Sequence, residues 1–127
     1  MRILISLFIY LLLSSCTFFT IDNDACEEVF LITEQQPEIR GGLRAIQQRV
    51  IYPQDAIDAE IQGRVIVQFI IDSRGRSRDH RITRTLSPST DQEAIRVIST
   101  AEYTPGIQNG VPVCTQLDLP IIFRLRS

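Results

Sequence analysis

The fold is decided by residues 63–75, which read GRVIVQFIIDSRG. The side chains that alternate onto one face of this stretch are all apolar: Val65, Val67, Phe69 and Ile71. This period of two is that of a β-strand with one buried face. The opposite face mixes Arg64, Gln68 and Asp72 with two isoleucines, so we expect it to be only partly solvated.

A turn and a second strand follow directly. Residues 72–75 combine turn-forming residues, and Gly75 tolerates a positive φ. We therefore expect residues 76–86 to return as the second strand of an antiparallel hairpin.

The end of the chain predicts a third and longer strand. Asn109-Gly110 is a strong signal for a tight turn. After it, one face of the segment carries Val113, Thr115, Leu117, Leu119, Ile121, Phe123 and Leu125. Pro120 lies inside this strand and has no N–H to donate, and proline is tolerated at a sheet edge or a bulge. The segment is therefore interpreted as an edge strand with one buried side.

Two helical regions complete the pattern. Residues 43–61 have apolar side chains at helical spacing and a break at Tyr52-Pro53. Thr90 with Glu93 matches a capping box, which predicts a helix over residues 91–101. The order helix, strand, strand, helix, strand predicts a two-layer α+β domain. In it, a small antiparallel sheet of about three strands packs against two helices.

The N-terminus has the features of an export signal, which we assign to residues 1–15. Arg2 precedes an apolar run over residues 3–13, which is shorter than the ~20 residues that span a bilayer. Residues 13–16 (LSSC) resemble the lipobox of bacterial lipoproteins, whose cysteine is diacylated and begins the mature chain. This resemblance predicts a stable lipid anchor on Cys16.

The alternative is an uncleaved signal anchor, because residues 17–21 could extend the apolar run to about 20 residues. Both interpretations place the rest of the chain in the cell envelope, anchored to a membrane and facing the periplasm. The lipobox favours an outer-membrane lipoprotein over an inner-membrane signal anchor.

The segment after the signal is acidic and only modestly apolar. We expect residues 16–38 to be a tether with little regular structure, followed by one folded domain over residues 39–127. An oxidising compartment would favour a disulfide between Cys26 and Cys114. Cys114 alternates away from the core, so the tether could cross that face and place Cys26 against it. Two separate thiols remain the alternative, because a sequence does not show the Cα separation that a disulfide requires.

The sequence offers no pattern for catalysis, for a metal or for a cofactor. His80 is the only histidine, and it has no partners at the spacing that a general base or a metal ligand requires. Asp72 and Asp79 flank the hairpin, where turn and strand-end roles explain them better than a catalytic pair. No glycine-rich phosphate loop, nucleophile elbow or CxxC motif is present in the sequence. We therefore expect a binding protein rather than an enzyme.

The charge pattern leaves one question open. The net charge is -2, which gives no strong field for nucleic acid, and nucleic acid is not expected outside the cytoplasm. Five arginines crowd the predicted hairpin: Arg74, Arg76, Arg78, Arg81 and Arg84. They could contact anionic lipid headgroups, a glycan or an acidic peptide, or they could form a solvated surface balanced by nearby acids.

This series of signals, in this order, resembles the TonB C-terminal domain family over residues 37–126. The resemblance is carried by Pro37, Gly41, Gly42, Tyr52, Pro53, Ala56, Gly63, Val65, Val67, Phe69, Asp72, Gly75, Asp91, Glu93, Ala94, Arg96, Val97, Tyr103, Pro105, Gly106, Gly110, Val113, Pro120, Ile121 and Phe123. Ser77 and His80 stand where members of that family usually have apolar residues.

The resemblance implies a function. TonB proteins carry energy from a proton-driven motor in the inner membrane to outer-membrane receptors. Their C-terminal domain binds a receptor segment by adding it as a strand to the sheet edge, a mode in which backbone hydrogen bonds supply affinity. For this chain the resemblance implies a protein partner at the edge strand, contacting Val113, Thr115, Gln116, Leu117, Asp118 and Leu119.

The same edge could also join two copies of the chain in a homodimer. A different interpretation is a structural or accessory envelope lipoprotein, which keeps the fold without transducing energy. A lipid anchor and a tether of about twenty residues argue against force transmission across the periplasm but are compatible with docking on a partner, so the binding module remains the leading interpretation.

Overall fold

The computed structural model describes residues 26–126. In chain order the elements are β1 (Val29–Phe30), β2 (Glu38–Ile39), α2 (Gly42–Gln48), α3 (Gln54–Asp58), β3 (Gly63–Ile71), β4 (Ser77–Arg84), α4 (Pro88–Thr100), β5 (Tyr103–Thr104), β6 (Gly106–Gln108) and β7 (Val111–Phe123). The predicted signal peptide, the lipobox and Cys16 lie outside the described residues. Within residues 26–126, no helix has the length and apolar character needed to cross a membrane.

β3 is the central strand of the sheet. It pairs antiparallel with β4 on one side and with β7 on the other, and the β3–β7 ladder joins nine residue pairs. At its other end β7 pairs with β6 and, in parallel, with β1, so the described chain holds a five-stranded sheet. β2 and β5 form a separate two-stranded sheet.

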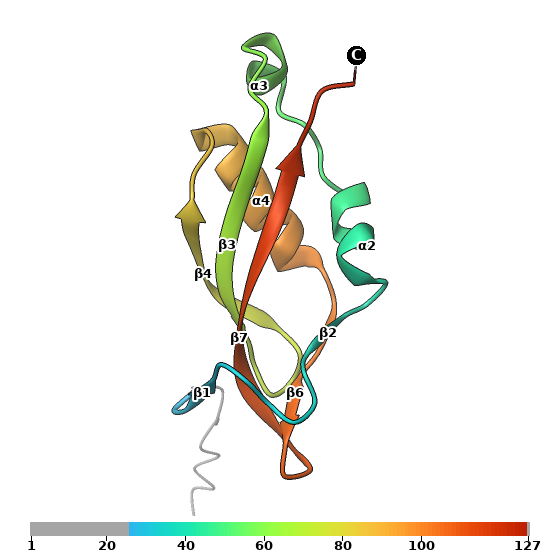
Figure 1. Ribbon diagram of the computed structural model, residues 1–127, viewed down its shortest axis with the longest axis vertical. Coiled ribbons are helices and arrows are strands. Elements are labelled where there is room, and N and C mark those ends of the chain that lie inside the picture. The colour runs from blue at the N-terminus through green and yellow to red at the C-terminus, as the bar shows by residue number, and fades with distance from the viewer. Residues whose placement is uncertain (1–25, 127) are drawn as a thin grey trace, which may run out of the picture.

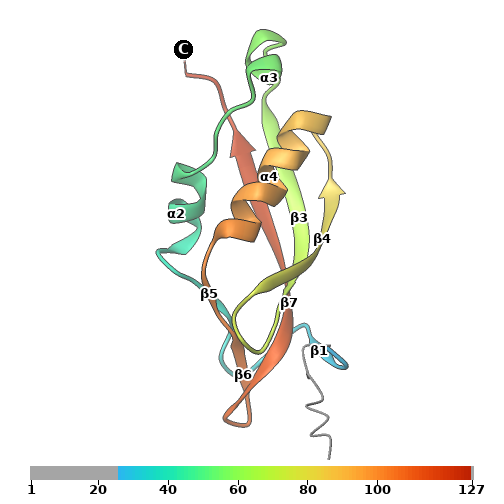
Figure 2. The same cartoon turned by 180° about the vertical axis from the view of Figure 1, so that it is seen from behind.

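The domain has two layers, as the sequence predicts. The long strands lie in front of α4 in Figure 1 and behind it in Figure 2, with α2 beside β7 in both views. The predicted α+β fold class is therefore confirmed. The sheet has more strands than the expected three, because β1 and β6 are two and three residues long and show no period in the sequence.

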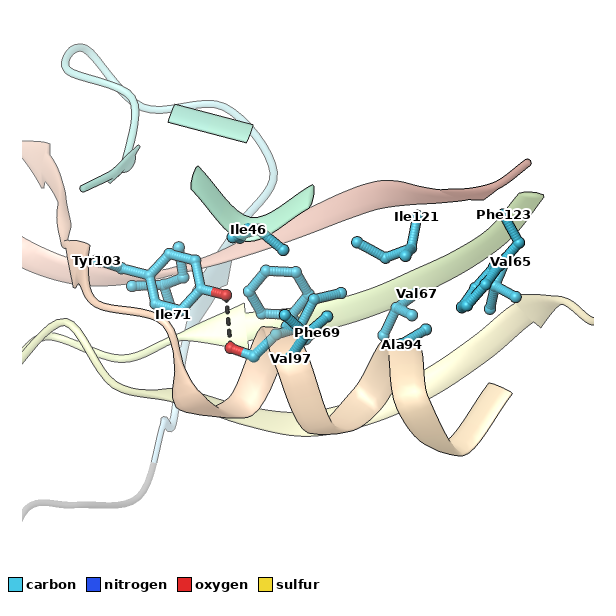
Figure 3. Packing of buried hydrophobic residues seen from close by; sticks show 11 residues of the cluster. Ile46, Val65, Val67, Phe69, Ile71, Ala94, Val97, Tyr103, Ile121 and Phe123 are labelled. Carbon is cyan, nitrogen blue, oxygen red and sulfur yellow. Dashed lines mark hydrogen bonds between the residues drawn. The ribbon is translucent and has the colours of Figure 1, made fainter. Parts of the chain in front are cut away.

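The hydrophobic core lies between the sheet and α4. Its fully buried side chains include the predicted inward row of β3 with Ile121, Ala94, Val97 and Ile98. Phe69 lies near the middle of this layer, with the ring centroid of Tyr103 at 5.5 Å (Figure 3). The Tyr103 hydroxyl donates a hydrogen bond of 2.7 Å to the carbonyl of Ile98. Burial raises the pKa of Tyr103, so this donor stays protonated.

The opposite side of the sheet faces away from α4, and we call it the open face. The strand pairing places on it Arg64, Ile66, Gln68 and Ile70 of β3, Arg78, Arg81 and Arg84 of β4, and Gln116, Asp118, Pro120 and Ile122 of β7. Four apolar residues among these polar ones keep the face only partly solvated, as expected from β3.

α4 begins earlier than the sequence pattern suggests. Its N-cap is Ser87, whose hydroxyl accepts a hydrogen bond from the Thr90 N–H, and Thr90 reciprocates through its own side chain. The predicted capping box of Thr90 with Glu93 is therefore wrong. Pro88 explains the earlier start, because its missing N–H falls in the first turn, where helix N–H groups have no intrahelical partner.

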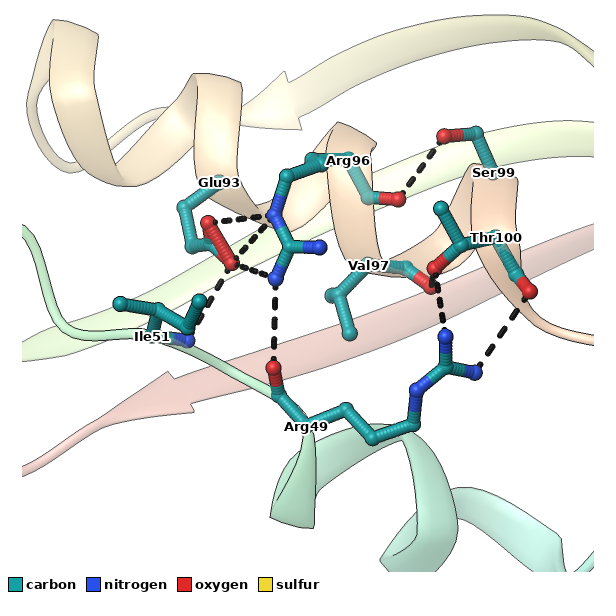
Figure 4. A network of polar contacts seen from close by, with 7 residues as sticks. All are labelled: Arg49, Ile51, Glu93, Arg96, Val97, Ser99 and Thr100. Carbon is teal, nitrogen blue, oxygen red and sulfur yellow. Dashed lines mark hydrogen bonds and ion pairs between the residues drawn. The ribbon is translucent and has the colours of Figure 1, made fainter.

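Glu93 has another role, in a polar network that joins the N-terminal helices to α4 (Figure 4). It accepts hydrogen bonds from the Arg96 guanidinium at 2.9 Å and from the Ile51 N–H at 3.2 Å. Arg96 also donates to the carbonyl of Arg49, whose own guanidinium donates to the Thr100 hydroxyl at 3.1 Å. Hydrogen bonding from Arg96 is the main reason that the pKa of Glu93 is lowered. The network holds the segment between α2 and α3 against α4.

Residues 26–39 have little regular structure, as expected, but they lie against the domain and are not a separate tether. β1 pairs with β7, β2 pairs with β5, and Gln35 exchanges backbone hydrogen bonds of 2.9 and 3.1 Å with Ile107. A disulfide joins Cys26 to Cys114, with the Cα atoms 5.9 Å apart. These contacts use backbone groups and one cross-link, which an acidic composition does not reveal.

Gly75 should tolerate no side chain. Its φ is +82°, and a Cβ atom there would lie 2.3 Å from the carbonyl oxygen of Tyr103. Gly110 has a similar φ of +75° but no atom within 4 Å of its Cβ position. We expect Gly75→Ala to lower the free energy of unfolding by about 3 kcal/mol or more, and Gly110→Ala by about 1 kcal/mol. Urea denaturation measures both, and equal losses would contradict the predicted clash.

The disulfide should stabilise the domain strongly, because Cys26 and Cys114 are 88 positions apart in the sequence. We expect the double variant Cys26→Ser/Cys114→Ser to lose about 2–4 kcal/mol of unfolding free energy. Denaturation with and without dithiothreitol checks this. The reductant should bring the wild type to the level of the double variant and leave that variant unchanged. An equal effect of dithiothreitol on both proteins would contradict the assignment.

Candidate strand-docking edge

The outer side of β7 has backbone groups that face away from β3, and the side chain of Gln47 shows which ones. Gln47 Nε2 donates to the carbonyl of Ile122 at 2.7 Å, and Gln47 Oε1 accepts from the Ile122 N–H at 3.1 Å. Both backbone groups of Ile122 therefore point outward. In an antiparallel pair this direction alternates from residue to residue, so Gln116, Asp118 and Pro120 also point outward.

This alternation of inward and outward backbone groups explains why a proline is tolerated in the strand. Pro120 pairs with Ile66 at a position where β7 sends no hydrogen bond to β3. Its missing N–H therefore removes nothing from the ladder. The sequence interpretation of Pro120 as a residue of a sheet edge is consistent with this position.

The free part of the edge has two limits. At one end β1 pairs with Cys114 and Thr115, and the disulfide to Cys26 fixes it there. At the other end Gln47 occupies the groups of Ile122. Among the described residues, no strand pairs with the outer side of residues 116–121. We call residues 116–121 the free edge.

Four of the six residues predicted for partner binding lie on the free edge: Gln116, Leu117, Asp118 and Leu119. The other two, Val113 and Thr115, do not lie on the free edge, so the prediction is wrong for them. Val113 pairs with Gly106 of β6, and Thr115 is fully buried between Ile71 of β3 and Phe30 of β1. Gln47 was missed, because a single side-chain contact between α2 and β7 has no periodic signal in the sequence.

The side chains of the free edge point in two directions. Leu117 and Leu119 are partly buried and pack against the core cluster. Gln116 and Asp118 lie on the open face, where Asp118 is exposed. A strand placed beside the free edge would therefore meet apolar side chains on one face and polar side chains on the other.

β4 forms the other edge of the sheet and is a poorer template. Its pairing with β3 shifts register in two places. Asp79 has a φ of +54° inside the strand, so the row of outward N–H and C=O groups is interrupted. Bulges of this kind protect an edge from pairing with another chain.

The titratable residues of the hairpin have structural surroundings. Asp72 is buried and accepts hydrogen bonds from the N–H groups of Arg74 and Arg76 at 3.0 and 2.9 Å. His80 stacks on Phe69 with ring centroids 5.8 Å apart, and burial lowers its pKa despite the nearby Asp79. Within the described residues, no three potential metal ligands of the His, Cys, Asp and Glu types come together.

Comparison with known proteins matches this arrangement. The family described as the Gram-negative bacterial TonB protein C-terminal matches residues 48–125. Protein TonB of Vibrio cholerae is 29% identical over 77 residues, which cover 60% of this chain and 32% of that protein. The chain therefore spans about a third of the length of this relative.

Two solved structures have the same fold. A TonB C-terminal domain of Pseudomonas aeruginosa aligns with a TM-score of 0.56 and 23% identity, over 77% of this chain and 95% of that one. A TonB C-terminal domain of Helicobacter pylori aligns with a TM-score of 0.53 and 24% identity, over 66% of this chain and 77% of that one. The family model matches more than half of this chain, so the chain belongs to the TonB C-terminal domain family.

Proposed function

We propose that this protein is a cell-envelope binding module that captures a segment of an outer-membrane receptor by strand addition, in energy-dependent transport across the outer membrane. The observation that carries the proposal is the free edge, a stretch of β7 whose outward backbone groups have no strand beside them within residues 26–126. Membership of the TonB family supports a receptor as the partner.

The free edge suits a short and selective contact. Asp118 offers both an N–H and a C=O group, whereas Pro120 offers only a C=O group. Each backbone hydrogen bond contributes only about 0.5–1.5 kcal/mol, so a few of them give modest affinity. Contacts with Leu117 and Leu119 on one face and with Gln116 on the other would supply the selectivity.

A proline at position 118 should weaken capture. Asp118 directs its N–H outward, so Asp118→Pro removes a bond to the partner and leaves the β3–β7 ladder intact. We expect about a tenfold loss of affinity for a synthetic receptor peptide by calorimetry, and less than a threefold change for the control Asp118→Ala. From the sequence alone, Leu117→Pro would serve equally well. The register argues against it, because Leu117 pairs with Phe69 and its N–H bonds to β3.

Unchanged peptide affinity in a folded Asp118→Pro variant would contradict strand addition at β7. A constitutive envelope complex that survives Asp118→Pro would favour the accessory lipoprotein instead. Dimerisation that is lost in Asp118→Pro and kept in Asp118→Ala would indicate that a second copy of the chain occupies the free edge.

We further propose that a lipid on Cys16 anchors the protein to a membrane with the domain in the periplasm. Intact mass of membrane-extracted protein should fit an acylated chain that begins at Cys16, and Cys16→Ala should lose this species. An unmodified chain that retains residues 1–15 would support the signal anchor instead.

A further inference from the structure

The five arginines of the hairpin do not form one cluster. Arg76 forms an ion pair with Asp72, and Arg78 forms one with Asp79 and also lies 4.0 Å from the sulfur of Cys26. Arg81 and Arg84 lie on the open face, farther along β4 from the turn. There Arg84 meets two arginines that the hairpin pattern does not include, one from β3 and one directly after β7.

Arg64, Arg84 and Arg124 line one hollow at the end of the sheet. The hollow has a volume of about 430 Å³ and is also lined by Gln62, Gly63, Ile122 and Phe123. Among the described residues, no hydrogen bond or ion pair involves the guanidinium of any of these three arginines. By contrast, Arg49 and Arg96 are bound in the network of Figure 4.

The surroundings of the hollow favour an anionic amphiphile over a small free anion. Unpaired guanidinium groups bind phosphate oxygens through parallel hydrogen bonds. Ile66, Pro120 and Ile122 form an apolar strip beside them, and Ile122 is 46% exposed. Among the residues that the strand pairing places on the open face, Asp118 is the only acid. A lipid headgroup joins a phosphate to apolar chains and fits both parts of this surface.

The path of the chain brings the open face toward a membrane. Cys26 is held at this face by its disulfide to Cys114 and by its contact with Arg78 of β4. Cys26 is ten positions after Cys16, which is at most about 36 Å of extended chain. A domain tethered this closely at its open face can lay that face on the bilayer.

We propose that the open face docks on the anionic phospholipid surface of the anchoring membrane, with Arg64, Arg84 and Arg124 binding lipid phosphates. The proposal rests on the proposed membrane anchor. Docking leaves the free edge of β7 accessible, because a strand added there lies in the plane of the sheet and parallel to the membrane surface.

The absence of tryptophan from the sequence allows a direct test. Gln68→Trp places a single fluorophore on the open face, and Gln92→Trp places one on the exposed side of α4. Each full-length variant is reconstituted with vesicles of brominated phosphatidylglycerol or brominated phosphatidylcholine, and quenching of the fluorophore is measured. We expect strong quenching of Trp only for Gln68→Trp and only with phosphatidylglycerol.

Arginine substitutions test the site itself in the Gln68→Trp background. Arg64→Gln/Arg84→Gln should reduce the ratio of docked to undocked domain about 25-fold, since each arginine near an anionic surface contributes about one factor of five. The control Arg40→Gln/Arg74→Gln removes the same charge from hollows that share no residue with this one, and it should have little effect.

Equal quenching with the two lipids, or equal losses in the two double variants, would overturn the proposal. A chain that lacks the proposed membrane anchor would be recognised by a separate result, because it would not sediment with phosphatidylcholine vesicles. Quenching on phosphatidylglycerol would still decide whether the open face docks.

Discussion

The ladder between β3 and β7 is the interaction on which the rest of the structure depends. Its nine residue pairs bring the two strands with the strongest alternation together, so their apolar sides form one surface for α4 to cover. The same ladder determines which residues of β7 direct their backbone N–H and C=O groups to β3 and which direct them outward. Pro120, the contact of Gln47 with Ile122, and the free groups of Asp118 all follow from that alternation.

The sequence predicts those parts of the fold in which a regular pattern of apolar residues extends over many positions. β3 and β7 are expected because alternation over nine or more residues is distinct from helical spacing, and β4 is expected from the turn that follows β3. The parts that it does not predict depend on single contacts. β1 is a two-residue strand in an acidic segment. Ser87, and not Thr90, is the N-cap of α4, because Pro88 occupies the first position of the helix.

The candidate site was predicted in part for the same reason. Gln116, Leu117, Asp118 and Leu119 follow from the alternation of the last strand and from Pro120. Val113 and Thr115 were included because the sequence does not show that β6 and β1 occupy their end of the strand. The disulfide and Gln47 thus define the length of the free edge from contacts 88 and 75 positions apart in the chain. The arginines of the open face lie outside this edge, so partner capture and membrane docking can use different surfaces of one sheet.

Amide hydrogen exchange, read residue by residue by NMR with and without a receptor peptide, tests strand addition at β7 most directly. In the free protein the amides of Leu117 and Leu119 should be protected by β3, and the amide of Asp118 should exchange fast. Addition of the peptide should protect Asp118 and leave the β4 amides unchanged. An Asp118 amide that exchanges equally fast in the complex, with new protection on β4 or elsewhere, would contradict the account.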